Sequence, residues 1–122
     1  MHVAAKEGRK EVAELLLANK AEINARDING VTPLHLASET AGYEDVVKLL
    51  LENQAEVNAR HSSGMTALQR AANEGDLAVV KLLLDNKAEV NATNNAGLTP
   101  LRFASGSSRR AEAAMLRQHG GH

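Results

Sequence analysis

Aliphatic residues recur along the chain in short clusters whose spacing is typical of amphipathic helices. In the best-defined cluster, Val46, Val47, Leu49, Leu50 and Leu51 give a wide apolar stripe, which predicts a helix from about residue 44 to about residue 53. Similar clusters lie at residues 12–17 and 79–84, and the first predicts a helix over about 10–19. Helices this short are marginal alone in water, so their apolar faces require partners.

A turn followed by a second, shorter helix precedes the cluster at residues 44–53. Gly30 permits a tight turn, Thr32 is placed to cap a helix with its hydroxyl, and Pro33 suits the first helical position. A helix is therefore expected from about Pro33 to about Thr40, ending near Gly42. Residues 61–71 and 94–104 repeat the whole stretch, so the chain is a repeat array.

The repeat has a defined period. Asn24, Asn58 and Asn91 occupy equivalent places at spacings of 34 and 33 residues. This period, with the Thr-Pro-Leu-His-x-Ala motif at residues 32–37, resembles the ankyrin repeat family over the whole chain. The resemblance implies an all-α ankyrin-repeat solenoid of about four helix–turn–helix units with projecting turns, in a single domain (1–122). The units are expected at about 1–26, 27–60, 61–93 and 94–122, and stacking closes their shared core.

The two ends of the array differ. The first unit lacks the turn and the Thr-Pro start, so it is expected to be truncated and to expose apolar surface. The last helix, about Ala111 to Gln118, carries Glu112, Arg117 and Gln118 at core-type positions, which is typical of a terminal cap. We therefore expect either a monomer or weak self-association through the N-terminal end.

Several residues depart from the family pattern. The second unit has one extra residue between Ala37 and Gly42, which predicts a longer or bulged first helix. The glycine usual after the second helix is replaced three times, so either the replacing residues or the asparagines before them adopt left-handed backbone angles. The replacing residues are Lys20, Gln54 and Lys87, and the asparagines are Asn19, Asn53 and Asn86. Thr66 and Gln69 form a capping box in the third unit.

Composition narrows the function classes. A net charge of −1 gives no electrostatic case for nucleic acid or an anionic membrane, and no aromatic residues interleave with the arginines near the C-terminus. No apolar run approaches the roughly 18 residues that a membrane-spanning helix needs, and no signal peptide is visible. The absence of cysteine excludes disulfides and thiolate metal sites. A cytoplasmic location is expected.

No catalytic or metal-binding constellation is recognisable. His35 resembles the structural histidine of the family, His61 lies on a turn, and His119 and His122 lack a further ligand at metal-binding spacing. The serines at 105–108 lack a nucleophile elbow and are interpreted as an irregular helix end. We expect no enzyme activity, no cofactor and no metal.

The recurring asparagines have two interpretations. In the family, Asn24, Asn58 and Asn91 correspond to a residue that stabilises the turn, which is the favoured reading. Their Glu-Val-Asn-Ala-like context also resembles sites that asparagine hydroxylases modify in animal cells.

The resemblance implies a non-catalytic protein–protein interaction module that binds a protein partner with its turn tips and concave helix face. Val31, Met65 and Leu98 form an apolar row along the turns, unless this position packs on the next turn. The alternative function is an architectural fragment of a longer ankyrin array, with its main binding site in absent repeats. The full set of candidate partner-binding residues is Ile28, Asn29, Val31, Glu39, Thr40, Arg60, Ser62, Ser63, Met65, Arg70, Asn73, Glu74, Asn95, Ala96 and Leu98.

Overall fold

A computed structural model describes residues 1–6, 9–19, 21–40, 42–74, 77–104 and 110–122. Helices within these ranges alternate between shorter and longer, as the repeat predicts. They are α1 (His2–Lys6), α2 (Lys10–Ala18), α3 (Pro33–Ser38), α4 (Glu44–Glu52), α5 (Ala67–Glu74), α6 (Leu77–Asp85), α7 (Pro100–Phe103) and α8 (Arg110–Gln118). None of these helices is long and apolar enough to cross a membrane.

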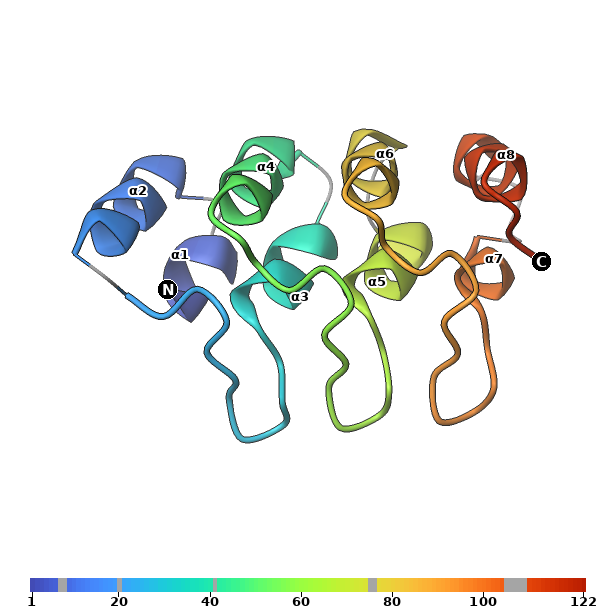
Figure 1. The fold of residues 1–122 in the computed structure, drawn as a ribbon, viewed down its shortest axis with the longest axis horizontal. Helices are drawn as coiled ribbons and strands as arrows, with labels where there is room; N and C mark the ends of the chain where they lie inside the picture. Colours follow the sequence, from blue (N-terminus) through green and yellow to red (C-terminus); the bar gives the residue numbers. More distant parts are fainter. Residues whose placement is uncertain (7–8, 20, 41, 75–76, 105–109) are drawn as a thin grey trace.

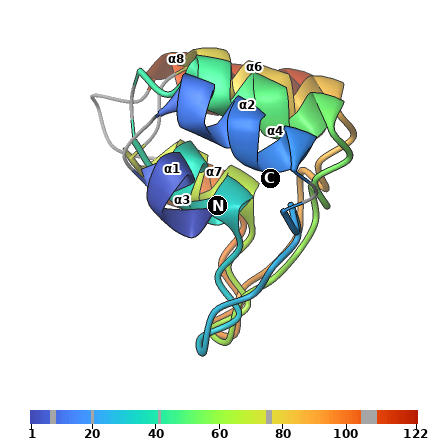
Figure 2. The same ribbon diagram turned by 90° about the vertical axis from the view of Figure 1, so that its left-hand side faces the viewer.

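The helices stack in two rows (Figure 1). An outer row consists of α2, α4, α6 and α8, and an inner row consists of α1, α3, α5 and α7. Three loops project beyond the inner row, at residues 27–32, 61–66 and 94–99, and are called the first, second and third finger. Figure 2, which looks along the array, shows the fingers superimposed on one side of the helices.

The core runs along the array between the two rows. Val46, Val47 and Leu50 of α4 are fully buried, and so are the equivalent Val79, Val80 and Leu83 of α6. These side chains join one continuous cluster with inner-row residues such as Leu34 and Leu68. Because each helix pair covers its neighbour, burial comes mainly from stacking, as in other repeat proteins.

The expectation of a longer first helix in the second unit is wrong, whereas the alternative of a bulged helix stays a prediction, because Ala41 lies outside the described residues. Helix α3 has 6 residues and ends at Ser38, whereas α5, its equivalent in the third unit, has 8. Glu39 already serves as the C-cap of α3. The extra residue therefore does not extend α3.

The backbone angles at the ends of the outer helices show which residues adopt the left-handed conformation. Gln54 and Lys87 have φ angles of 70° and 68°, whereas Asn53 has φ −102°. The alternative that the preceding asparagines take this conformation is wrong, because Asn19, Asn53 and Asn86 are not among the described residues with positive φ. Asn53 and Asn86 instead donate side-chain hydrogen bonds to carbonyls of their own helices. In the last unit Gly120 takes the position, with φ 88°. Lys20 and the serines at 105–108 lie outside the described residues.

Helix α8 ends the outer row with a polar surface. Arg117 and Gln118 are exposed and Glu112 is half-buried, whereas Leu116 and Ala113 point into the core. This pattern confirms the sequence-based expectation of an outward face that water can wet.

Candidate functional site

Each finger is closed by its first side chain. The Asp27 carboxylate accepts hydrogen bonds from the amides of Asn29 (2.8 Å) and Val31 (2.9 Å), and these bonds lower the pKa of that carboxyl. Asn94 makes the same two bonds in the third finger. In the second finger, Nδ1 of His61 accepts from the Ser63 amide at 3.0 Å. Three different side chains thus produce one turn geometry.

The fingers are also bonded to one another. The Ser62 amide donates to the Asn29 carbonyl at 2.9 Å, and the Asn95 amide donates to the Ser63 carbonyl at 2.9 Å. The Asn95 side chain adds a bond to the Ser62 carbonyl at 2.9 Å. Hydrogen bonds between neighbouring fingers therefore hold the backbone of the three tips in place.

A second set of bonds joins each inner helix to the next finger. The Thr32 amide donates to Nδ1 of His35 at 3.1 Å, so Nε2 carries the proton and donates to the Met65 carbonyl at 3.0 Å. Burial lowers the pKa of His35 to about 4, and the nearby positive charge of Arg70 acts in the same direction. His35 is thus a neutral structural group, as its position in the repeat motif predicted.

Gln69 and His2 also bond to the finger that follows them. Gln69 accepts from the Thr66 amide (2.7 Å) and its own amide donates to the Thr66 hydroxyl (3.3 Å), which confirms the predicted capping box. The Gln69 side chain also donates to the Leu98 carbonyl at 2.9 Å. His2 lies with Nε2 at 2.8 Å from the Val31 carbonyl. The sequence analysis missed this role of His2, although Met1-His2 aligns with Leu34-His35 and provided the signal.

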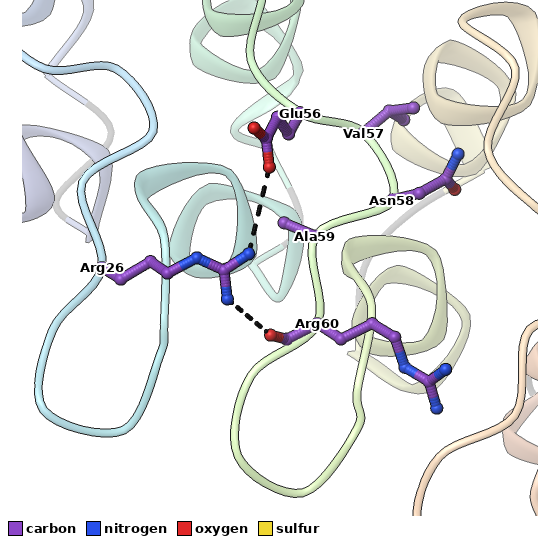
Figure 3. Close-up of a pocket in the computed structure, with 6 residues that line it drawn as sticks. All are labelled: Arg26, Glu56, Val57, Asn58, Ala59 and Arg60. Atoms are coloured by element: carbon purple, nitrogen blue, oxygen red, sulfur yellow. Dashed lines mark hydrogen bonds and ion pairs between the residues drawn. The ribbon is translucent and has the colours of Figure 1, made fainter.

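Arginines join the bases of the fingers. Nη1 of Arg26 donates to the Arg60 carbonyl at 2.9 Å, and Nη2 lies 3.9 Å from the Glu56 carboxylate (Figure 3). Arg60 in turn donates to the carbonyls of Gly64 and Thr93. The open hollow of about 540 Å³ that these residues line is thus built from internally paired charges, which does not favour a small-molecule site.

The recurring asparagines bridge successive units. Oδ1 of Asn24 accepts from the Glu56 amide at 2.8 Å, and Oδ1 of Asn58 accepts from the Glu89 amide at 2.7 Å. Asn91 repeats the bond with the His122 amide at 3.0 Å. These contacts agree with the turn-stabilising interpretation. Modification of these asparagines stays an untested prediction.

The candidate residues on the fingers differ in accessibility. Ile28 is 99% exposed, and the neighbouring tip residues Asn29, Ser62, Ser63, Asn95 and Ala96 are also exposed. The apolar row is not uniform, because Val31 is 8% exposed and Met65 is half-buried, whereas Leu98 is 36% exposed. Val31 therefore packs within the array, which agrees with the alternative interpretation of this position.

The candidate residues on the inner helices centre on an ion pair. Nη1 of Arg70 on α5 lies 2.6 Å from the carboxylate of Glu39 at the end of α3. Both side chains are only partly exposed, at 18% and 33%. Thr40 and Asn73 are half-buried beside the ends of the same helices, and Glu74 is exposed.

Comparison with protein families agrees with this architecture. A family model described as ankyrin repeats (3 copies) matches residues 1–61, and a second, described as ankyrin repeats (many copies), matches residues 50–104. The chain belongs to the ankyrin repeat family. A comparison with curated proteins gave no match.

Ankyrin repeats generally act as protein–protein interaction modules and are typically non-catalytic. Within the described part of this ankyrin array, no group of three acidic or histidine side chains is placed to hold a metal ion. His119, considered above as a metal ligand, instead lies with Nδ1 at 2.9 Å from the Met115 carbonyl. It thus takes the helix-ending role that Asn86 has in the third unit.

Proposed function

We propose that this ankyrin array binds a protein partner with its finger tips and the neighbouring inner-row residues. The observation that carries the proposal is the full exposure of Ile28, a large aliphatic side chain at the tip of the first finger. At equivalent positions the other fingers carry Ser62 and Asn95. The Ile28 side chain buries almost no area within the array, so it is available to an apolar pocket on another protein.

The fingers present this surface already ordered. Backbone bonds from Ser62 to Asn29 and from Asn95 to Ser63 hold the three tips in register. A partner therefore meets a surface that loses little conformational entropy on binding, which favours affinity for a given area.

The inner-row residues supply polar contacts beside the tips. Arg70 is held by Glu39 and keeps only part of its guanidinium exposed. A pair that is already neutralised favours hydrogen-bonding groups of a partner over a single strong charge. The polar neighbours Thr40, Asn73 and Glu74 extend this surface. The Arg60 guanidinium donates to the carbonyls of Gly64 and Thr93, so we place Arg60 at the edge of the proposed binding surface.

Capture of partners from a host lysate with two matched variants tests the proposal. The test variant carries Ile28→Asp and Ser62→Asp, both at exposed tip positions whose side chains make no structural bond in the described residues. The control carries Ala78→Asp and Ala111→Asp, which add the same charge at exposed positions in the first turns of outer-row helices. Aspartate is well tolerated there.

The proposal requires a protein that wild type and control retain and that the tip variant loses, with all three chains unfolding at the same temperature. A set of partners retained equally by all three chains contradicts it. So does a set lost with the control alone, which would move the binding surface to the outer row.

A further inference from the structure

The second finger is closed by a histidine, whereas the other two are closed by side-chain oxygens. Asp27, His61 and Asn94 occupy the first position of the three fingers. Nδ1 of His61 accepts from the Ser63 amide at 3.0 Å, so this ring nitrogen carries no proton. Carboxylate and amide oxygens accept hydrogen bonds throughout the range near neutral pH, whereas an imidazole nitrogen accepts only when it is unprotonated. The closure of the second finger therefore depends on the protonation of one side chain.

The second finger also has fewer closing bonds than its neighbours. Oδ1 of Asp27 and Oδ1 of Asn94 each accept from two amides, two and four residues further along the chain. His61 accepts from the backbone only two residues further on, and the Met65 amide, four residues further on, has no acceptor among the described residues. Loss of the bond from the Ser63 amide therefore removes the whole contribution of the side chain to closing this turn.

The second finger lies between the other two and is bonded to both (Figure 1). Its Ser62 amide donates to the Asn29 carbonyl of the first finger at 2.9 Å. Its Ser63 carbonyl accepts from the Asn95 amide of the third finger, also at 2.9 Å. The residue whose amide bonds to His61 thus also holds the third finger. A change in the turn of the second finger therefore acts on both neighbouring tips.

The surroundings of His61 disfavour a charged ring in the closed finger. Burial lowers the pKa of His61, the positive charge of Arg70 on α5 acts in the same direction, and the Asp27 carboxylate on the first finger acts in the opposite one. On α3, the neutral ring of His35 lies 5.4 Å away, and at its end the Glu39 carboxylate is paired with Arg70. The third finger carries no charged residue. Uptake of a proton therefore favours a conformation in which the ring leaves this position.

From this geometry we propose that the second finger is a pH-sensitive switch, which is closed while His61 is neutral and opens in mild acid, and that opening releases a protein bound at the finger tips. Protonation turns Nδ1 into a donor that faces the donor of the Ser63 amide, so the ring turns away and the turn loosens. Closure is complete above about pH 6.5, the ordinary histidine pKa, and is lost as the pH falls below it. The release rests on the proposed function, whereas the opening is independent of it.

Amide exchange at the finger tips tests the opening without a partner. All chains carry His35→Gln, which removes the neighbouring titratable ring and supplies the bonds that Gln69 makes at the equivalent position of α5. Protection factors, which are corrected for the direct effect of pH on exchange, are compared at about pH 7.5 and about pH 5.5, one unit on either side of the ordinary histidine pKa. We expect protection of the Ser63 and Asn95 amides to fall by about fivefold or more at the lower pH.

Two reciprocal variants isolate the histidine. His61→Asn gives the second finger the closing group of the third, so its tip should stay protected at both pH values. Asn94→His should confer the loss on the third finger, where the Ala96 amide donates to this side chain. A fall in protection that persists in His61→Asn belongs to another histidine and overturns the proposal. Unchanged protection of the Ser63 and Asn95 amides in the chain that keeps His61 also overturns it.

Elution of captured proteins by acid tests the release. A protein captured at about pH 7.5 should leave the chain that keeps His61 at about pH 5.5 and stay on His61→Asn, with a difference of about fivefold in the amount retained. Equal retention by both chains, together with an open second finger, overturns the release. Capture of no protein by either chain at the higher pH contradicts the proposed function and the release with it, while the exchange measurements still decide the opening.

Discussion

At the scale of single residues, histidine and glutamine side chains make the same hydrogen bond from an inner helix to the next finger. His2, His35 and Gln69 each donate to a carbonyl of the following finger, and His35 and Gln69 also accept from the amide at the start of their helix. Glutamine makes these bonds at any pH, whereas histidine makes them only when neutral. Replacement of one by the other thus changes the response of the array to acid.

We predict that His35 makes the fold sensitive to mild acid. The folded pKa is about 4 and the unfolded pKa is about 6.5, so the unfolded chain binds the extra proton first. The stabilisation is complete above pH 6.5 and is lost as the pH falls from 6.5 to 4, by up to about 3 kcal/mol. Urea unfolding at a series of pH values should show this loss in wild type, and His35→Gln should flatten it.

The reverse substitution provides the control. Gln69→His should steepen the same pH dependence, because it places a second neutral histidine in an equivalent buried position. Lowered stability of His35→Gln with an unchanged slope against pH would contradict the assignment. The pKa of His61 is also lowered by burial, and its ring lies 5.4 Å from that of His35, so a His61→Ser background for all three chains removes its contribution.

At the scale of elements, the fingers hold one another. Each closes locally through its first side chain, but the next finger sets its position, through backbone bonds and through close approach. At Gly64 a Cβ atom would lie 2.9 Å from the Asn95 amide nitrogen, whereas at Gly97 it would meet nothing within 4 Å. The two glycines have almost the same backbone angle, with φ of 81° and 78°.

This pair of glycines separates backbone strain from finger contact. Gly97→Ala should destabilise the fold by about 1 kcal/mol through its left-handed angle alone. Gly64→Ala should destabilise it by at least about 1 kcal/mol more, because the third finger must move away. Urea unfolding of both variants measures the difference, and amide exchange at Asn95 should rise only in Gly64→Ala. Equal losses in both variants would show that the fingers adapt freely.

At the scale of the whole molecule, equivalent residues differ in burial according to their place in the array. Val12, Val46 and Val79 occupy the same position of the repeat, yet only the last two are covered by a preceding unit. The energetic weight of a repeat position is therefore set by its neighbours, as expected for a one-dimensional stack.

We predict that Val46→Ala and Val79→Ala each cost about 2 kcal/mol of unfolding free energy, through lost burial and an unfilled cavity. Val12→Ala should cost less than about 1 kcal/mol, because its side chain is already partly in water. Chemical denaturation of the three variants gives the comparison. A loss at Val12 as large as at Val46 would mean that the Val12 side of α2 is covered in solution.

Much of the fold follows from local patterns in the sequence. The Thr-Pro-Leu-His motif, the turn glycines and the aliphatic clusters each depend on contacts within a few residues, so the all-α repeat and most helix bounds could be predicted. The structural role of His35 also followed from its motif. The length of α3 did not, because an extra residue fits equally well in a helix or in the loop after it until packing decides.

The candidate site was predicted only as a set of positions. The resemblance to ankyrin repeats placed Ile28, Val31 and Arg60 together as candidates. Only tertiary contacts separated an exposed tip, a buried side chain and an arginine that bonds the next finger. The same contacts gave His2 a partner 29 residues away and left the Glu22 and Ile28 amides without one in the described structure. The motifs that identify each repeat lie within a few neighbouring residues, so the sequence alone predicts them. Exposure depends on which unit lies next to each residue, so only the stacked structure decides it.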